Sequence, residues 1–197
     1  MHYLKQLSKD QVLAKTIGET GHELKLQKNI PLRLMGSILS QQLSTKVAEV
    51  IFKRFLDLYE GKEPKPQQVL DTPDLTLRAI GLSNAKVGYV KNVARFCIDH
   101  QITDKLLAKM SDEAIIDLLI QIKGVGRWTV EMLLMFSLGR EDVFAVDDLG
   151  IQQAMARLYR LDIADKKRLK ARMLEISAHW KPYRTYACLH LWKWNHA

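Results

Sequence analysis

Two apolar helical patterns, at residues 111–122 and 127–138, are separated by only four residues, 123–126. Apolar side chains recur at helical spacing in the first pattern, and the second is apolar on nearly every face. So short a link forces the two helices to fold back on each other. The linking residues, Lys123-Gly-Val-Gly126, contain two glycines that allow torsions other residues avoid. The sequence therefore predicts a tight pair of helices, the second of them buried.

The turn between these helices has the chemistry of a phosphate-binding site. The first amide groups of the second helix lack partners within that helix, and the positive end of its dipole lies beside them. Lys123 and Arg127 add positive charge next to Gly124 and Gly126. A plain tight turn between packed helices uses the same glycines, so the spacing alone leaves both interpretations open.

A pair of carboxylates, Asp147 and Asp148, directly precedes another helical pattern at residues 149–159. The start of a helix stabilises a charged carboxylate, and aspartates in this position usually serve as caps. A fixed carboxylate can also stabilise the positive charge that develops on a sugar when a glycosidic bond breaks. From the residues alone, both roles stay open.

Helical signals extend over most of the chain. Further helices are expected near residues 10–19, 31–40, 44–58, 73–80, 84–97, 148–159, 164–178 and 182–194. No strand pattern of useful length occurs, and no break has the composition of a flexible linker. We therefore predict a single all-α unit, 1–197, of two helical lobes with a cleft between them. One lobe would comprise residues 30–142, and the other residues 1–29 with 143–197.

The composition of the chain limits which kinds of partner and cofactor are expected. Thirty Lys and Arg residues against 22 Asp and Glu residues leave a formal charge of +8, which favours a polyanion but also suits plain solubility. The two cysteines, Cys97 and Cys188, indicate a reducing compartment and exclude a four-cysteine zinc or iron–sulfur site. The sequence has no membrane span or signal-peptide core. We expect a cytoplasmic, nucleoid-associated protein in a prokaryote, or a nuclear one in a eukaryote.

Four ordered blocks of sequence resemble the helix-hairpin-helix DNA glycosylase superfamily, most closely the alkylbase branch known as 3-methyladenine DNA glycosylase II. The blocks are 37–44, 81–83 with Lys86, 122–129 with 142–149, and 180–192. Together they cover about residues 30–194. The resemblance implies an enzyme that rotates a damaged base out of duplex DNA and breaks its bond to the sugar.

The resemblance assigns roles to individual residues. It places the catalytic aspartate on Asp148, which leaves Asp147 as the cap of the helix that follows. It aligns Gln42, with Leu43 as the neighbouring alternative, with the wedge that fills the gap left by the flipped base. The base pocket is implied at Trp128, Met132 and Trp192. Contacts to the DNA backbone are implied at Lys86, Lys123, Gly124, Gly126 and Arg127.

The same resemblance bears on cofactors. It implies a monovalent cation held by the backbone carbonyls of Ile120, Ile122 and Val125, and no other cofactor. Relatives that also cut the DNA backbone carry a lysine where this chain has Trp128, and that lysine forms a Schiff base with the sugar. Tryptophan cannot form this adduct. The resemblance thus implies a monofunctional enzyme that uses water and leaves an abasic site.

The choice of base depends on Met132. Alkylated purines such as 3-methyladenine and 7-methylguanine carry positive charge, so aromatic faces attract them and they leave readily. Met132 stands where the family pattern has a tyrosine, and methionine offers neither a ring nor a phenol. We expect a monomeric glycosylase for alkylated purines in double-stranded DNA. The alternatives are a glycosylase for deaminated bases, uracil or hypoxanthine, and a non-catalytic damage-binding protein.

Overall fold

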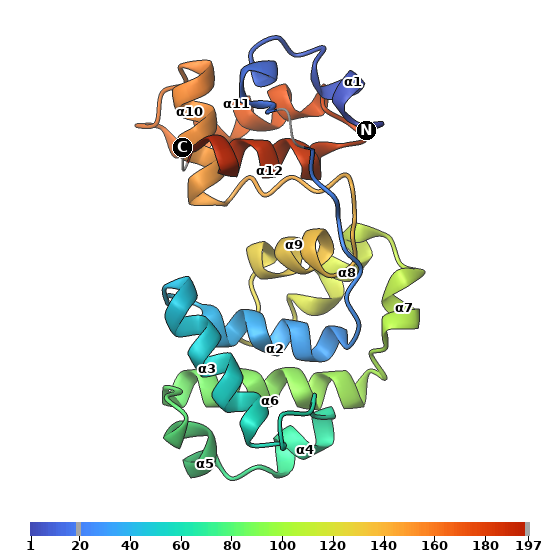
Figure 1. The fold of residues 1–197 in the computed structure, drawn as a ribbon, viewed down its shortest axis with the longest axis vertical. Coiled ribbons are helices and arrows are strands. Elements are labelled where there is room, and N and C mark those ends of the chain that lie inside the picture. Colours follow the sequence, from blue (N-terminus) through green and yellow to red (C-terminus); the bar gives the residue numbers. More distant parts are fainter. Residues whose placement is uncertain (19–20, 196–197) are drawn as a thin grey trace. The chain divides into compact units, whose positions relative to one another are not determined.

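The structure, a computed structural model, describes residues 1–18 and 21–195, apart from the side chain of residue 45. Throughout this part of the chain the regular elements are all helices (Figure 1), which confirms the predicted all-α class. None of these helices is long and apolar enough to cross a membrane.

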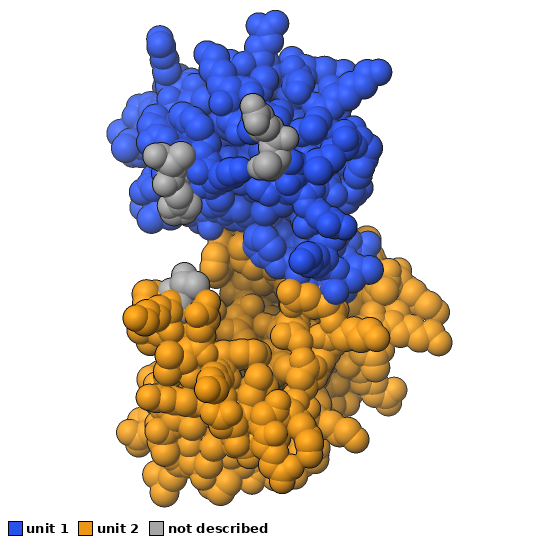
Figure 2. Space-filling model, viewed as in Figure 1, with its two compact units in different colours: residues 1–26, 134–197 blue, residues 27–133 orange. Residues whose placement is uncertain are grey.

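The chain divides into two compact units, Met1–Leu26 with Leu134–Ala197, and Gln27–Leu133 (Figure 2). The predicted boundary after residue 142 lies later than the observed one, which falls inside helix α9 (Arg127–Phe136). The chain turns just after this helix, at Gly139, whose φ is +62°. A Cβ there would lie 3.2 Å from Leu26, so the end of α9 joins the unit that contains the N-terminal segment.

The unit 27–133 is built around α6 (Asn84–Asp99), which packs against α2 and α4, while α2 also packs against α3. Its other helices are α2 (Ile30–Ser40), α3 (Thr45–Asp57), α4 (Pro66–Asp71), α5 (Asp74–Ala79), α7 (Asp104–Ala108), α8 (Asp112–Leu119) and the first turns of α9. The buried stripe of α6 that fills this core is Val87, Val90, Val93, Ala94 and Cys97, the predicted apolar face. The periodicity of apolar residues was sufficient to predict this helix and its buried face, because α6 is long enough to repeat the pattern several times.

Polar side chains determine where several of these helices begin. The hydroxyls of Ser83 and Ser111 accept hydrogen bonds from the third residue beyond them and cap α6 and α8. The start of α2 depends on a distant residue, because the carboxylate of Asp104 accepts from the amides of Asn29 at 2.8 Å and Ile30 at 2.9 Å. This bond joins α2 to α7, one of the short helices that the sequence did not predict.

In the other unit, α12 (Arg184–Asn195) packs against α10 (Leu149–Tyr159) and against a single 3-10 turn, η1 (Leu13–Thr16). Its remaining elements are α1 (Leu4–Leu7), α11 (Lys166–Ala178) and the end of α9. Arg184 anchors the start of α12 through a two-pronged pair with Asp142, at 2.7 Å and 3.0 Å.

The helix predicted near residues 10–19 is wrong over its described part, residues 10–18, where only η1 forms; residue 19 lies outside the described residues. Asp10 Oδ1 accepts from the amides of Val12 and Leu13, both at 3.0 Å, which bends the backbone into a turn. Its other oxygen accepts from Tyr159 at 2.6 Å and from Trp180 at 2.9 Å. Partners about 150 residues or more away thus hold this segment in a shape that local periodicity does not favour.

Candidate active site

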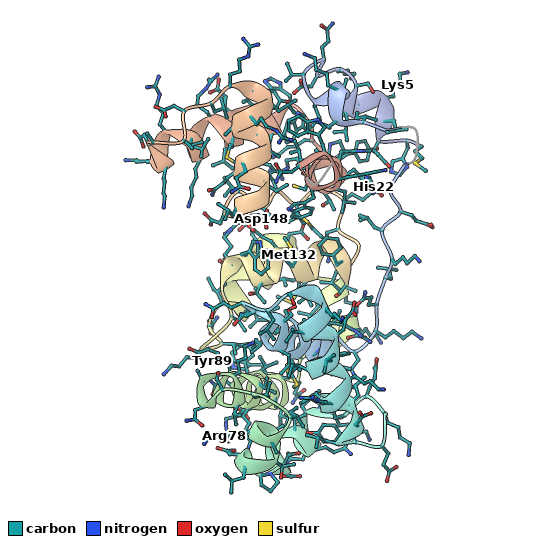
Figure 3. The ribbon with its side chains drawn as sticks, turned by 60° about the vertical axis from the view of Figure 1, so that its left-hand side comes forward. Lys5, His22, Arg78, Tyr89, Met132 and Asp148 are labelled. Atoms are coloured by element: carbon teal, nitrogen blue, oxygen red, sulfur yellow. The ribbon has the colours of Figure 1, made fainter. Side chains whose placement is uncertain are left out.

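Asp148 lies at the start of α10 (Figure 3) and caps that helix. Its Oδ1 accepts from the Ile151 amide at 2.9 Å and from Trp192 Nε1 at 2.8 Å. Both donors fix the orientation of this carboxylate at the positive end of the helix dipole. The predicted catalytic aspartate is therefore a fixed, partly buried anion.

The prediction that Asp147 caps this helix is wrong. Asp147 is exposed, and its carboxylate forms an ion pair with Lys170 of α11. The backbone of Asp148 is extended, with φ −70° and ψ 125°, so Asp148 is the last residue before the helix. The same side chain thus provides both the cap and the candidate catalytic carboxylate, two roles that the sequence had divided between neighbours.

Two further residues shape the surroundings of Asp148. Gln152 Nε2 donates to the Val146 carbonyl at 2.8 Å and holds the loop that leads to the aspartate. At Gly150, an added Cβ would lie 3.2 Å from both Asp148 Oδ1 and Trp192 Cδ1. Glycine therefore permits the close approach of the tryptophan to the carboxylate. No sequence pattern pointed to Gly150, because its role depends on Trp192, about 40 residues away.

One face of α9 is not buried, although the sequence predicted a helix buried all round. Trp128 and Phe136 are 41% and 42% exposed, and Met132, also on α9 (Figure 3), is partly exposed. Their spacing of four residues puts all three on the same face. The Phe136 ring also lies 5.9 Å from the Trp192 ring, tilted by 33°. Phe136 is thus an aromatic candidate that the sequence analysis missed, although its spacing from Trp128 was visible.

The members of the predicted base pocket belong to different units. Trp128 and Met132 lie in the unit 27–133, while Trp192 lies in the other. Their joint role in holding a base therefore stays a prediction. Within the unit 1–26 and 134–197, the structure brings together the carboxylate of Asp148, the indole of Trp192 and the ring of Phe136.

The predicted hairpin is present as α8, a short connection and α9, and its two glycines differ. Gly124 has φ +104°, and a Cβ there would lie 2.3 Å from the Tyr89 ring. Only glycine fits that position. At Gly126 a Cβ would meet no atom within 4 Å, so open space lies beside the start of α9. Gly124 closes the turn, whereas Gly126 leaves room for something to approach the helix.

The basic residues of the hairpin are placed differently from each other. Lys123 is exposed, whereas the Arg127 guanidinium pairs with Glu131 at 3.0 Å and with Glu113 at 3.1 Å. Burial works against the charge of Arg127, but the two carboxylates outweigh it and raise its pKa. The pair with Glu113 ties α9 to the start of α8, while the pair with Glu131 lies within α9. Phosphate contacts by Lys123 and Arg127 stay predictions.

The predicted wedge residue follows the end of α2. Gln42 is exposed and has φ +60°, a left-handed conformation that a residue with a side chain rarely adopts. A hollow of about 290 Å³ lies beside it, lined in part by Leu43 and Lys86. The Lys86 ammonium donates to the carbonyls of Leu39 at 2.9 Å and Gln41 at 2.8 Å. A contact between Lys86 and DNA stays a prediction.

The carbonyls predicted to hold a cation are of a suitable kind. Ile120 directly follows α8 as its C-cap, where carbonyls lack intrahelical partners, and carbonyl oxygens suit monovalent cations. The Ile122 carbonyl accepts from the Val125 amide at 2.9 Å, and a second lone pair remains on that oxygen. Monovalent-cation binding stays a prediction. Among the side chains of residues 1–18 and 21–195, no group of His, Cys, Asp and Glu is arranged to hold a metal.

Residues 35–179 match the family model of the HhH-GPD superfamily base excision DNA repair protein. The chain belongs to this superfamily. The match includes the hairpin, Asp148 and the turn that carries the predicted wedge residue Gln42, called the wedge turn below, so the superfamily assignment covers most of the residues described above. It does not reach Trp192.

Individual members of the superfamily are similar along nearly the whole chain. DNA-3-methyladenine glycosylase 1 of Schizosaccharomyces pombe is 39% identical over 92% of this chain and 79% of its own length. A putative DNA-3-methyladenine glycosylase of Bacillus subtilis is 34% identical over 98% of this chain and 68% of its own.

Solved structures support the same assignment. The S. pombe 3-methyladenine DNA glycosylase in complex with abasic DNA has a TM-score of 0.87, is 34% identical, and covers 100% of this chain and 98% of that one. A DNA-3-methyladenine glycosidase of Bacillus halodurans has a TM-score of 0.83 and is 36% identical, covering 96% of this chain and 87% of that one.

Proposed function

We propose that this protein is a DNA glycosylase that hydrolyses the bond between deoxyribose and an alkylated purine, such as 3-methyladenine or 7-methylguanine, in duplex DNA. The observation that carries the proposal is the Asp148 carboxylate, held at the start of α10 by the Ile151 amide and the Trp192 indole. Its place in a chain similar to 3-methyladenine glycosylases makes it the candidate catalytic group.

The chemistry follows from the carboxylate. Loss of the base leaves positive charge on the sugar, and a fixed anion nearby stabilises that charge without reorganising. Two donors on Oδ1 fix the orientation of the Asp148 carboxylate. Water then adds to the sugar carbon, its proton is released, and an abasic site and a free base are the products.

Trp128 gives the reaction its monofunctional character in this proposal. The position two residues beyond Gly126 is the one where a strand-cutting enzyme would need a primary amine. An indole cannot add to the sugar to form a Schiff base. The DNA backbone therefore stays intact until heat or alkali cleaves the abasic site.

Recognition of the base is assigned to aromatic faces. Trp128, Trp192 and Phe136 each present an indole or phenyl surface that is at least partly exposed. The electrons of such aromatic faces attract a cationic alkylated purine more strongly than they attract a neutral base. The positive charge also makes the purine a good leaving group, so no strong general acid is required.

Binding to duplex DNA is assigned to the hairpin and the wedge turn. A phosphate approaches the open space at Gly126, Lys123 supplies positive charge, and Gln42 fills the stack when the base leaves it. We propose that one copy of the chain suffices, acting at the nucleoid of a prokaryote or in the nucleus of a eukaryote.

The test is an analysis of the products from DNA treated with a methylating agent. The purified protein should release free 3-methyladenine or 7-methylguanine, and strands should break only after heating or alkali treatment. An adduct trapped by borohydride, or direct nicking, would contradict the water mechanism. Duplexes with a single uracil or hypoxanthine test the alternative substrate class that Met132 suggested.

A further inference from the structure

Lys86, on the first turn of α6, points its ammonium into the protein. Its Nζ donates to the carbonyl oxygens of Leu39 at 2.9 Å and of Gln41 at 2.8 Å, both at the end of α2. The side chain is only partly exposed, and burial lowers the pKa of its ammonium. Lysines that contact phosphate are usually solvated and extended. Two internal carbonyls instead use two of its three N–H donors.

These carbonyls control the backbone that leads into the wedge. The Gln41 carbonyl belongs to the peptide group that joins Gln41 to Gln42. Holding that oxygen in place also holds the plane of the peptide group that precedes Gln42. Gln42 itself has the left-handed φ of +60°. This conformation is unfavourable for a residue with a Cβ, so it persists only where its surroundings hold it. The Lys86 ammonium is the charged group that provides this support.

The helix that carries Lys86 also supports the hairpin. Asn92 Nδ2 donates to the Lys123 carbonyl at 3.2 Å, and the ring of Tyr89, labelled on α6 in Figure 3, packs against Gly124. Spacings of three residues put all three side chains within one broad face of α6. The side chain of Gln41 completes the connection, because its Nε2 donates to the Gly124 carbonyl at 3.4 Å. The wedge turn and the hairpin thus rest on the same helix.

An ordinary structural role explains part of this arrangement. A lysine near the end of a helix often binds the last carbonyls, and its charge suits the negative end of the dipole. Leu39 lies within α2, and a bond to its carbonyl alone would fit that role. The second bond goes beyond the helix, to the residue directly before Gln42. It is this bond that connects Lys86 to base flipping.

We propose that Lys86 is a positioning residue for the Gln42 wedge: it fixes the Gln41 carbonyl and thereby holds Gln42 ready to enter the base stack. The proposal rests on the proposed function, since a wedge has a role only in an enzyme that flips bases. It assigns Lys86 to the wedge turn rather than to a DNA phosphate.

The test combines Lys86→Met with Gln42→Ala in a double-mutant cycle. Flipping is followed by the fluorescence of 2-aminopurine beside the lesion, which needs no bond cleavage, and excision is followed under single-turnover conditions. Loss of a bond from a charged donor should slow both about tenfold. The double variant should be little slower than Gln42→Ala alone, because both changes remove the same wedge. Lys91→Met, also on α6 and paired with Asp74, is the matched control and should leave both rates unchanged.

Salt dependence separates positioning from a phosphate contact. The slope of log affinity against log salt should be the same for Lys86→Met and the unchanged protein, whereas a lost phosphate contact reduces it by about 0.9. Lys86→Arg, which keeps charge and donors, should restore most of the flipping rate. If Lys86→Met melts below the assay temperature, Lys86→Gln takes its place in the cycle.

Normal flipping by Lys86→Met, additive effects with Gln42→Ala, or a reduced salt slope would each overturn the proposal. Failure of the proposed function has a different signature. It would appear as no release of methylated base by the unchanged protein, whatever the flipping signal of the variants.

Discussion

Trp192 Nε1 donates a hydrogen bond of 2.8 Å to Asp148 Oδ1, the same oxygen that caps α10. The two residues are 44 positions apart and come from different helices, α12 and α10. The indole therefore has a role besides stacking on a base: it orients the carboxylate.

Replacing Trp192 with phenylalanine tests this role. The ring stays, so base stacking is largely kept, but the donor to Asp148 is lost. A bond to a charged acceptor is worth about 1.5–3 kcal/mol, so the single-turnover rate should fall about ten- to a hundredfold with little change in KM. Trp194→Phe, in the same helix, is the control and should retain full activity. A raised KM with an unchanged rate would show that Trp192 acts only in binding.

Asp148→Asn and Asp147→Asn form a matched pair. Asparagine is a good cap, so Asp148→Asn should fold and melt like the unchanged protein, yet its excision rate should fall by about 10²–10³ because the charge is lost. Asp147→Asn removes only an exposed ion pair with Lys170, so its rate should stay within about twofold. Base release from methylated DNA measures both. The reverse order would place the catalytic carboxylate on Asp147.

The two glycines of the hairpin should respond differently to alanine. Gly124→Ala places a Cβ against the Tyr89 ring at a left-handed position, so thermal unfolding should reveal a loss of about 1–3 kcal/mol. Gly126→Ala meets open space and should melt normally. Its affinity for duplex DNA should fall if a phosphate approaches there. Normal DNA affinity in Gly126→Ala would remove the argument for a phosphate at this position.

The stability of the protein should decrease in acid because of His190. This residue is fully buried, neither ring nitrogen has a hydrogen-bond partner among the described residues, and its ring lies 4.5 Å from that of His22. Burial, with smaller effects of His22 and Lys193, lowers the pKa of His190 from 6.5 to about 4. Between these values the unfolded chain binds the extra proton, so stability is complete above about pH 6.5 and is lost toward pH 4.

Melting temperatures measured between pH 7.5 and 4.5 check this prediction. His190→Phe, which cannot take up a proton, should show a weaker dependence on pH over this range. His179→Phe is the control, because His179 is exposed and should leave the dependence unchanged. Parallel curves for the unchanged protein and His190→Phe would mean that other groups cause the acid sensitivity.

The sequence by itself determined the all-α class, the long helices, the hairpin and the aspartate pair before α10, whereas only the family resemblance pointed to Asp148. Each of these depends on a local pattern: the periodicity of α6, two glycines between apolar helices, and an aspartate before a helix. Such patterns extend over a few residues, and within that range the geometry of a helix determines which side chains are neighbours. Short helices such as α1 and α7 were not predicted, because one or two helical turns are too short to show a periodic apolar pattern.

Only the tertiary structure decided which aspartate caps α10, what Trp192 does to Asp148, and where the Lys86 ammonium points. It also replaced the predicted N-terminal helix with η1, since Asp10 is held by Tyr159 and Trp180. Apart from the cap, whose partner Ile151 is three positions from Asp148, these outcomes depend on partners roughly 40 to 170 positions away. A hydrogen bond depends on distance and direction between side chains, and packing brings together residues whose spacing in the sequence carries no such information.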